Sequence, residues 1–530
     1  MSASLNWSLP YPSRKMPVLA SNVVATSQPL AAQAGLRMML AGGNAVDSAI
    51  ATAIALTVVE PVMNGIGGDM FALIWHEGKL YGLNSSGCAP AAWTPEYFSG
   101  RETMPPTGWG VVTVPGQVAG WKALSDRMGK LPFAKLFEPA IEYAENGFPV
   151  SPTIARQWAT QGPKLVHEPG FSEAFMPDGK APEAGTWWRF PAQARTLREI
   201  AETGGESFYR GNLAKQIADH ARATGGALNE EDLAAHKAEW VEPISQEFRG
   251  YTLNECPPSG QGIAALIALG ILEHFDLEGM GVDSADYYHV SIEAMKLAFA
   301  DLHHHVADPR HMRVSHEDLL DPAYLAERAK LISMERASVP LAGAPKTGGT
   351  VYLTAADAGG TMVSFIQSNY HGFGSGVVVP NTGISLHNRG LNFVLTPGHV
   401  NQVAPGKKPM HTIIPAFVTK DGAPVMSYGV MGGSMQAQGH LQMMTRLAAF
   451  NQNPQAMCDA PRFRVEAGPV VNVESHLPAE VVETLRARGH NVAVAPADSL
   501  EFGSAQLIYR MENGYFAASD ARRDGQAVGF

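Results

Sequence analysis

The chain has 530 residues, of which 45% are hydrophobic and 17% charged, an ordinary globular composition with enough apolar material for a large core. Its formal net charge is −11 and it has no dense run of lysine and arginine, so we expect no nucleic-acid partner. The longest apolar stretches, such as residues 49–63, are shorter than the about 18–20 residues of a membrane-spanning helix, so we expect no membrane partner.

The N-terminal segment has prolines and polar residues where a signal peptide needs an apolar centre, which indicates a cytoplasmic protein. The cysteine count is odd, and the sequence contains no CxxC pair. This pattern indicates neither a disulfide framework nor a zinc site, and we expect no metal ion and no cofactor. The three cysteines are Cys88, Cys256 and Cys458.

The first 330 or so residues are predicted to be rich in helix. Residues 29–43 have helical apolar spacing and end in a glycine pair, and a second helix should follow, with Asn44 as its N-cap and Pro61 as its stop. Residues 69–84 should form two strands that pair across a His-Glu-Gly turn. Further helices are predicted over residues 132–147, 211–226, 262–275 and 286–305.

The residue composition changes at residues 333–349, which are small, polar and proline-bearing and are predicted to form a mobile loop. Short alternating segments follow, and they predict a strand-rich C-terminal part. The predicted strands cover residues 350–356, 361–368, 412–420, 424–431 and 505–511. The chain therefore divides at Thr350 into a helix-rich segment, 1–349, and a strand-rich segment, 350–530.

Thr350 is the first candidate for chemistry, because a Gly-Gly pair delivers its hydroxyl to the first position of a strand. The simplest interpretation is a turn that enters a hairpin. The alternative is cleavage between Gly349 and Thr350, which would give the threonine a free α-amine that serves as its own base. Such an amine titrates near 7.7–8.0, so much of it is neutral at working pH.

Two further patterns have both a structural and a functional interpretation. A strand runs into Gly432 and Gly433, and a helix follows from about Ser434, so the two glycine amides could form an oxyanion hole or a tight turn. Arg389 stands in a loop near Asn392, where it could bind a carboxylate in bidentate fashion or be structural.

Two other motifs carry weaker signals. Adjacent histidines at 303–305 point in different directions on a helix, so this cluster is interpreted as solvated or capping. The segment Gly-Ile-Gly-Gly-Asp-Met at 65–70 lacks the full dinucleotide-binding fingerprint and follows a helix, not a strand.

Taken together, these motifs resemble the γ-glutamyltransferase family of N-terminal-nucleophile hydrolases over nearly the whole length. The matching segments occur in family order and are AGGNAVDSAIATA, GIGGDMF, VPGQVAGW, LNEEDLAAHKAEWVEPI, PPSGQG, TVYLTAAD, GFGSG, PGKKPMHTIIP and GGSMQAQ. The resemblance implies an α+β fold, a four-layer αββα sandwich. It also implies autocleavage before Thr350 into a large and a small chain that stay associated as partners. Thr350 would be the nucleophile, Gly432 and Gly433 the oxyanion hole, and Ser368 a hydroxyl that helps hold the nucleophile.

The departures from the family pattern concern the substrate pocket. Ser86 stands where the family has an arginine for the α-carboxylate of a γ-glutamyl group. Other family positions for the glutamyl group also differ, and we expect the residues there to contact the substrate. They are Tyr370, Arg389, Asn392, His411 and Thr412. The pattern is similar to the oxamate amidohydrolase branch, which implies a small amide substrate that carries a carboxylate.

Three hypotheses remain. The first is an amidohydrolase for a small carboxylate-bearing amide such as oxamate. The second is a γ-glutamyl hydrolase or transferase, or a related acylase, with a rebuilt pocket, and the third is a non-catalytic relative. Retention of Thr350, Ser368 and the glycine pair argues against the third, and the serine at position 86 argues against a γ-glutamyl enzyme. The sequence leaves open whether the chain forms a homo-oligomer.

Overall fold

The structure is a computed structural model that describes residues 10–11, 15–339, 349–466 and 468–530. The strands are β1 Val18–Ala20, β2 Val23–Thr26, β3 Asp69–His76, β4 Lys79–Ser85, β5 Phe148–Pro149, β6 Trp187–Trp188, β7 Glu239–Val241, β8 Ile244–Phe248, β9 Tyr251–Glu255, β10 Gly349–Ala356, β11 Met362–Tyr370, β12 Val378–Val379, β13 Ile384–Ser385, β14 Ala416–Lys420, β15 Ala423–Val430, β16 Phe463–Val465, β17 Val470–Val473, β18 Asn491–Val494, β19 Ala505–Arg510, β20 Tyr515–Ser519 and β21 Gln526–Gly529.

The α-helices are α1 Pro29–Leu40, α2 Ala45–Val59, α3 Gln117–Met128, α4 Glu138–Asn146, α5 Pro152–Gln161, α6 Phe171–Phe175, α7 Pro191–Thr203, α8 Glu206–Arg210, α9 Asn212–Ala223, α10 Glu230–Ala234, α11 Gly262–Leu272, α12 Leu277–Met280, α13 Ala285–His305, α14 His316–Leu319, α15 Pro322–Ala329, α16 Met435–Ala448, α17 Pro454–Asp459 and α18 Ala479–Ala487. Short 3-10 helices are η1 Pro95–Phe98, η2 Trp109–Val111, η3 Phe133–Phe137, η4 Gly162–Lys164, η5 Pro309–His311 and η6 Arg389–Asn392.

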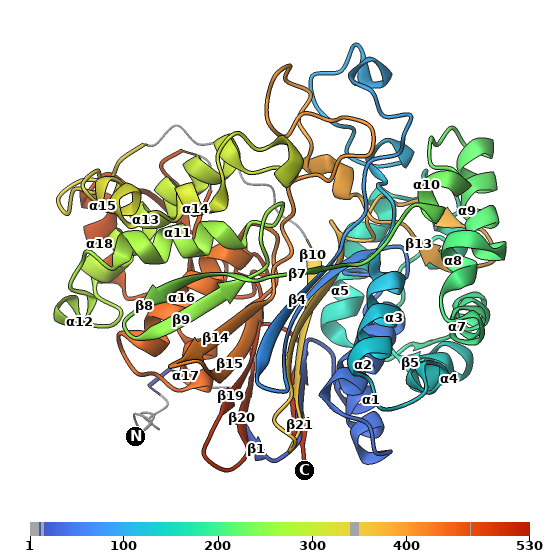
Figure 1. The fold of residues 1–530 in the computed structure, drawn as a ribbon, viewed down its shortest axis with the longest axis horizontal. Coiled ribbons are helices and arrows are strands. Elements are labelled where there is room, and N and C mark those ends of the chain that lie inside the picture. The colour runs from blue at the N-terminus through green and yellow to red at the C-terminus, as the bar shows by residue number, and fades with distance from the viewer. Residues whose placement is uncertain (1–9, 12–14, 340–348, 467) are drawn as a thin grey trace.

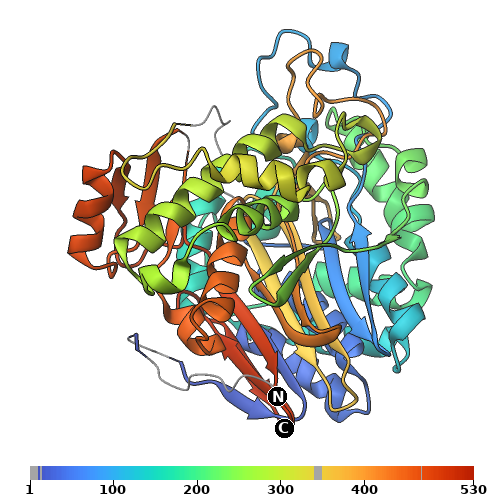
Figure 2. The same ribbon diagram turned by 60° about the vertical axis from the view of Figure 1, so that its left-hand side comes forward.

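Two seven-stranded sheets dominate the described residues, and helices cover the outer face of each sheet (Figure 1). One sheet has the order β1-β20-β19-β15-β14-β9-β8 and the other β21-β2-β10-β11-β3-β4-β7. Seen from another side, the helices α11 and α13 lie across the front of the first sheet (Figure 2). The predicted α+β fold, a four-layer αββα sandwich, is therefore confirmed.

The alternation of side chains along β3 shows how the layers are built. Met70, Ala72 and Ile74 face the core that β3 shares with the helix α2, whereas Phe71 and Leu73 face the core between the two sheets. Successive side chains of a strand point to opposite faces, so a strand buried on both sides is apolar throughout. The other outer core lies between the first sheet and the helices α11, α13 and α16.

Most predicted elements are confirmed at their predicted places. Asn44 caps α2, and its side chain accepts hydrogen bonds from the backbone N–H groups of Val46 and Asp47. The helix ends at Val59, two residues before the predicted stop at Pro61. The predicted helix 132–147 is divided into η3 and α4, since Pro139 falls in the first turn of α4, where its missing N–H costs nothing.

The predicted loop 333–349 lies only partly within the described residues. Residues 340–348 lie outside the described residues, and residues 333–339 contain no helix or strand. In the part of the chain that the structure describes, no helix is long and apolar enough to cross a membrane. All three cysteines are free thiols.

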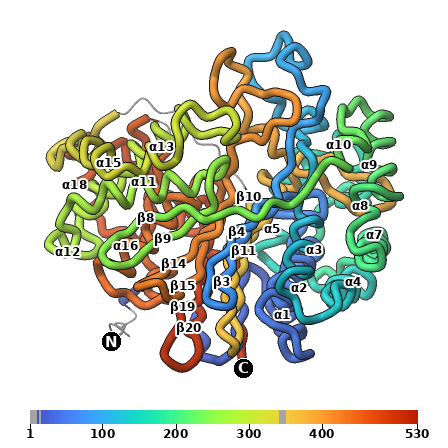
Figure 3. Tube along the Cα trace, viewed as in Figure 1, coloured from blue at the N-terminus to red at the C-terminus, as the bar shows by residue number. Residues whose placement is uncertain are grey.

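Strands from the two sides of Thr350 are interleaved in both sheets. In the sheet that contains β10, the strands β10, β11 and β21 follow the boundary and the strands β2, β3, β4 and β7 precede it. Figure 3 shows this as blue and yellow-orange traces that run side by side through the centre of the molecule. The segments 1–349 and 350–530 therefore share one αββα sandwich.

Candidate active site

Thr350 lies at the start of β10, in the middle of a sheet, with β2 and β11 as neighbours. The register between β10 and β11 shifts between Gly349 and Val351, which is a bulge at the threonine. The side chain of Thr350 is fully buried.

Among the described residues, the side chains of Ser368 and Gln436 contact the Thr350 hydroxyl. Its Oγ1 lies 3.3 Å from the Oγ of Ser368, and the Nε2 of Gln436 donates a hydrogen bond to it at 3.2 Å. The Oγ of Ser368 in turn accepts a hydrogen bond of 2.7 Å from the backbone N–H of Tyr370. The predicted neighbour Ser368 is thus next to Thr350, while its role stays a prediction. Gln436 was not predicted as a site residue.

The sequence did hold a signal for Gln436. It stands two residues after Ser434, the N-cap of α16, so the turn that follows the glycine pair carries it to the site. Its Oε1 accepts a hydrogen bond of 3.0 Å from the backbone N–H of Ile414. Because both ends of the amide are engaged, the orientation of its NH₂ group toward Thr350 is fixed.

Gly432 and Gly433 connect β15 to α16, as predicted. Their φ angles are 122° and 62°, a backbone region that strongly favours glycine. Both residues are buried, and among the described residues neither backbone N–H has a hydrogen-bond acceptor. The side chain of Gln261 holds the loop by donating to the carbonyl oxygen of Gly433 at 2.8 Å. Two buried donors without an acceptor are what an oxyanion hole requires.

Asp69 is a central residue that sequence reasoning missed. It pairs with Ser368 in the register of β3 and β11, and its carboxylate is fully buried. Arg389 donates to it from Nε at 2.9 Å and from Nη2 at 3.1 Å. The rings of His411 and His387 approach it at 2.6 Å and 3.2 Å. The sequence signal was the Gly-Gly-Asp motif, which lacks the full dinucleotide-binding fingerprint and also belongs to the GIGGDMF segment of the family resemblance, but no role was assigned to its aspartate.

The electrostatics of this cluster leave one buried ion pair. Burial opposes ionisation of Asp69, but the Arg389 guanidinium and the two histidines outweigh it and hold the pKa well below its usual range. Burial and the neighbouring Arg389 lower the pKa of His411 to about 4, so this imidazole is neutral at neutral pH. Asp69 and Arg389 therefore form a buried ion pair within this cluster.

The structure revises the expected environment of Arg389. Its side chain is fully buried, its Nη1 donates to the Oγ1 of Thr412 at 2.8 Å, and its Cζ lies 4.5 Å from the centre of the Tyr370 ring. Sequence reasoning expected a guanidinium that was free to bind substrate, yet Asp69 already matches its charge. Binding of a substrate carboxylate by Arg389 stays a prediction, which now has to use its remaining N–H groups.

Some of the predicted pocket residues meet at a cavity of about 280 Å³. Tyr370, Asn392 and Thr412 line it, together with Ser434 and Gln261.

Other predicted residues are placed differently. His411 was expected to line the pocket, but its ring packs against Phe71 at a centroid distance of 4.7 Å and bonds to Asp69 behind the cavity. The Ser86 hydroxyl donates to the Oδ1 of Asn84, and Ser86 is not among the residues that line this cavity.

His303 is a further correction. It was interpreted as solvated or capping, but its half-buried side chain lines the same cavity, and burial lowers its pKa. The helix α13 turns this histidine inward, while His304 on the same helix is exposed.

In the described residues, no group of three or more His, Cys, Asp or Glu side chains is arranged to hold a metal ion.

The αββα sandwich, with a hydroxyl residue at the start of a central strand and a glycine pair on the neighbouring sheet, defines an N-terminal-nucleophile hydrolase. The chain belongs to the gamma-glutamyltranspeptidase family, whose model matches residues 31–530. It is therefore an enzyme of a family whose members are made as self-processing proenzymes.

Individual relatives are similar over nearly their whole length. The chain is 37% identical to the glutathione hydrolase-like YwrD proenzyme of Bacillus subtilis (strain 168), over 96% of this chain and 98% of that protein. It is 38% identical to the oxamate amidohydrolase proenzyme of Klebsiella pneumoniae, over 94% and 97%. Among solved structures, a cephalosporin acylase from Bacillus halodurans matches with a TM-score of 0.94 and 49% identity, covering 99% of both chains.

Proposed function

We propose that the protein is an N-terminal threonine amidohydrolase whose nucleophile is the Oγ1 of Thr350. The observation that carries this proposal is the geometry around the hydroxyl. Thr350 contacts Ser368 and Gln436 at 3.3 Å and 3.2 Å, and Gln436 follows the turn from β15 to α16, whose two buried glycine amides have no acceptor among the described residues. A hydroxyl nucleophile and a preformed pair of donors are the two parts that acyl transfer needs.

The first reaction is self-cleavage. The Thr350 Oγ1 attacks the carbonyl carbon of Gly349, the C–N bond breaks, and an ester forms on the hydroxyl while the former amide nitrogen becomes an amine. Water then hydrolyses the ester, which leaves Gly349 with a carboxylate and Thr350 with a free α-amine. Gln436 orients the hydroxyl through its hydrogen bond, and Ser368 lies within reach to relay the proton.

The same hydroxyl then acts on the substrate. The α-amine takes the proton of the Thr350 hydroxyl as Oγ1 attacks the amide carbon, and the oxyanion accepts hydrogen bonds from Gly432 and Gly433. The α-amine returns the proton to the leaving nitrogen, which departs as ammonia or an amine. Water hydrolyses the resulting ester and releases a carboxylic acid.

We further propose that the acyl part of the substrate is small, carries a carboxylate as in oxamate, and lies against the cavity lined by Tyr370, Asn392 and Thr412. Arg389 does not line this cavity itself but lies behind it, since it donates to Thr412 and its Cζ is 4.5 Å from the centre of the Tyr370 ring. Its contacts with Asp69 and Thr412 use three of its five N–H donors, so two remain for a carboxylate. The volume of about 280 Å³ suits a small group. The similarity to a relative named oxamate amidohydrolase supports the same substrate.

The test compares ammonia release from oxamate with chromophore release from a γ-glutamyl anilide, using the mature enzyme and Thr350→Ala as the matched control. The proposal expects hydrolysis of oxamate, little hydrolysis of the anilide, and neither with Thr350→Ala. Activity that survives in Thr350→Ala would remove Thr350 from the mechanism. Preference for the anilide would contradict the carboxylate-bearing acyl group.

A second candidate, an acylase for amides with a large amine part, has its own support. A second cavity of about 520 Å³ reaches Gly432, and a solved structure with 49% identity is described as a cephalosporin acylase. Oxamate has a bare NH₂ as its leaving part and would leave this second cavity empty.

A further inference from the structure

Gln261 connects the glycine turn of the candidate active site to the chain segment that lines the substrate cavity. It precedes Thr350 in the sequence, stands directly ahead of α11, and is buried, with 1% of its surface exposed. Its Nε2 donates to the carbonyl oxygen of Gly433 at 2.8 Å and to that of Thr412 at 2.5 Å. One amide group therefore contacts both the turn that carries the two free glycine amides and a residue of the cavity of about 280 Å³.

The surroundings of this side chain require a hydrogen-bond donor. Both partners of Nε2 are carbonyl oxygens, which accept hydrogen bonds and cannot donate them. The NH₂ group has two N–H donors, so each carbonyl oxygen receives one. The backbone N–H of Gln261 makes a further bond, of 2.8 Å, to the carbonyl oxygen of His411. The residue is thus held at its backbone and at the end of its side chain.

The glycine pair needs restraint from its neighbours. Gly432 and Gly433 have no side chains that limit the rotation of their peptide groups. The first turn of α16 supplies part of the restraint, since its backbone N–H groups donate to the two glycine carbonyl oxygens at 3.1 Å and 3.2 Å. Gln261 supplies a side-chain bond to the carbonyl oxygen of Gly433. Rotation of this turn would move the N–H groups away from an oxyanion, and Gln261 opposes that rotation.

The segment from His411 to Ile414 is linked to the nucleophile as well. The backbone N–H of Ile414 donates to the Oε1 of Gln436, and the Nε2 of Gln436 donates to the Thr350 hydroxyl. Two glutamines therefore join one segment to the two parts of the reaction, Gln436 to the hydroxyl and Gln261 to the glycine turn. Because Gln261 precedes Thr350, cleavage would turn its side-chain bonds into contacts between the two chains.

We propose that Gln261 is a positioning residue for the oxyanion hole, which keeps the N–H groups of Gly432 and Gly433 aimed at the substrate carbonyl. The inference rests on the proposed function, in which these two N–H groups bind the oxyanion. Because the oxyanion forms only after attack by the nucleophile, misplacement of the turn lowers kcat more than it changes KM.

The first experiment replaces Gln261 by methionine, which has a similar length and shape but no donor. For the better of two substrates, oxamate or the γ-glutamyl anilide, we expect kcat to fall about ten- to a hundredfold, less than the about hundred- to thousandfold loss that follows removal of an oxyanion donor itself. The rate is counted per mole of small chain on a denaturing gel, so incomplete maturation does not lower it. A wild-type kcat, or a loss confined to KM, would overturn the inference.

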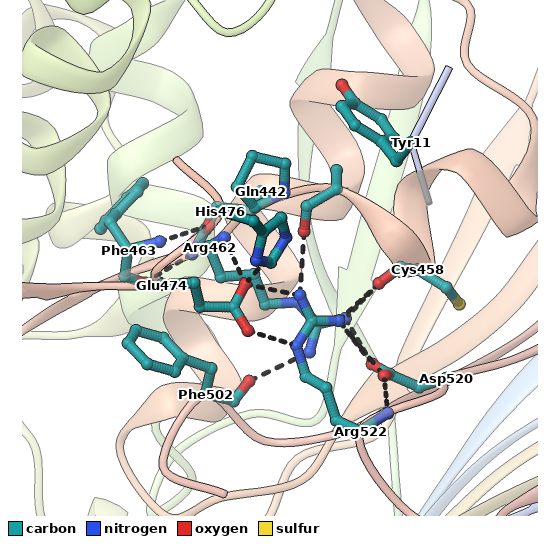
Figure 4. Close-up of polar contacts among 12 residues, drawn as sticks. Tyr11, Gln442, Cys458, Arg462, Phe463, Glu474, His476, Phe502, Asp520 and Arg522 are labelled. Carbon is teal, nitrogen blue, oxygen red and sulfur yellow. Dashed lines mark hydrogen bonds and ion pairs between the residues drawn. The ribbon is translucent and has the colours of Figure 1, made fainter. Parts of the chain in front are cut away.

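Gln442 on α16 offers a matched control. It is also buried, and its Nε2 donates to the carbonyl oxygens of Gln438 and Phe463, each at 3.1 Å. Figure 4 shows Gln442 beside Phe463. Gln442 lines neither cavity of the candidate site, and Gln442→Met removes at least as many hydrogen bonds as Gln261→Met, yet its kcat should stay near that of the wild type. Equal losses of kcat in the two variants would show a general effect of stability and contradict the positioning role.

A pH profile distinguishes a lost donor from altered packing. Gln261→Glu keeps the shape, but its carboxylate can donate to neither carbonyl oxygen, whereas its protonated form donates to one. Burial raises the pKa of such a carboxyl group, so the donating form increases as the pH falls. The ratio of its kcat to that of the wild type should therefore rise from about pH 8.5 to about pH 5, while the ratio for Gln261→Met stays flat.

The ratio removes the titrations that the proteins share, those of the Thr350 amine, His303 and His411. The profile of Gln261→Glu compares one protein with itself, so it remains decisive where Gln261→Met is poorly folded. A Gln261→Glu ratio that stays flat over this pH range would overturn the inference.

Hydrogen–deuterium exchange separates this inference from the proposed function. It is measured on Thr350→Ala without substrate. Adding Gln261→Met should speed exchange of the backbone N–H groups of Met435 and Gln436, which bond to the glycine carbonyls, by about tenfold, and adding Gln442→Met should not. If this is seen while the wild type hydrolyses neither amide, the proposed function fails and the hold of Gln261 on the turn stands. If amides are hydrolysed but neither exchange nor kcat responds to Gln261→Met, the inference fails and the proposed function stands.

Discussion

Asp69 and Arg389 should be strongly coupled in stability, and a double-mutant cycle measures that coupling. The perturbations are Asp69→Asn, Arg389→Met and the two together. Both side chains are fully buried and share two hydrogen bonds, of 2.9 Å and 3.1 Å. Each single substitution leaves one buried charge without its partner, which costs on the order of 3–5 kcal/mol. The double variant leaves no unmatched charge and should lose much less.

The magnitude follows from this asymmetry. If each single variant loses about 3–5 kcal/mol and the double variant loses no more than either, the coupling energy is about 3 kcal/mol or larger. Independent residues more than about 7–10 Å apart couple by no more than about 0.5 kcal/mol. The structure therefore predicts a coupling several times larger than that of unconnected sites.

The assay is urea denaturation of the four proteins in the Thr350→Ala background, so that each unfolds as a single uncleaved chain. The free energies of unfolding at zero urea give the coupling directly. Additive losses, with a double variant that is as damaged as the sum of the singles, would refute the buried ion pair. The cycle also shows why Arg389→Ala alone is a poor test of substrate binding, since it leaves the buried Asp69 carboxylate without its guanidinium partner. The double variant, tested with carboxylate and uncharged amides, is the cleaner probe.

Thr350→Ala should block both maturation and activity, while Thr350→Ser should keep some of each. Mass analysis of the mature wild-type protein should find a small chain that begins Thr-Val-Tyr-Leu. An intact 530-residue chain with full activity would contradict this. Gln436→Ala should slow maturation by about tenfold, as expected for the loss of one hydrogen bond of roughly 1–1.5 kcal/mol. Gln436→Glu should mature more slowly than Gln436→Asn, because a carboxylate cannot donate to the hydroxyl. Gel time courses of chain cleavage measure these rates. Glu60→Gln should change the pH dependence of stability. The folded pKa of Glu60, about 7, is above the ordinary value of 4.5, so its contribution to stability is full below about pH 4.5 and is lost as the pH rises through 7. The variant should therefore gain roughly 2–3 kcal/mol over wild type at pH 8 relative to pH 4, and parallel pH profiles of the two proteins would contradict this.

The features that the sequence predicted well are those set by neighbours along the chain. The Asn44 cap, the strands β10 and β11, and the turn from β15 through Gly432 into α16 all rest on residues within a few positions of one another. Hydrophobic periodicity and glycine placement carry this local information. The whole layered fold followed only from the family resemblance, because no local pattern specifies how two sheets pack.

The features that the sequence did not predict are long-range contacts. Asp69 meets Arg389 across 320 positions of the chain and His411 across 342. No spacing rule links such residues, so a carboxylate beside Arg389 could not be anticipated and the arginine was expected to be free. Gln261 escaped notice for a related reason, since its partners Thr412 and Gly433 lie 151 and 172 positions further along the chain.

The interleaved strand order has a consequence for how the mature protein can be made. In the uncleaved chain, β2, β10 and β11 find one another as parts of a single molecule, so folding is unimolecular. Cleavage before Thr350 would leave the strands paired but would divide them between two molecules, and any later refolding would become bimolecular and dependent on concentration. The uncleaved precursor would then be the form that folds readily, and cleavage would remove that route. The stability of the mature enzyme would be set by how slowly it opens, not by how readily it can fold again.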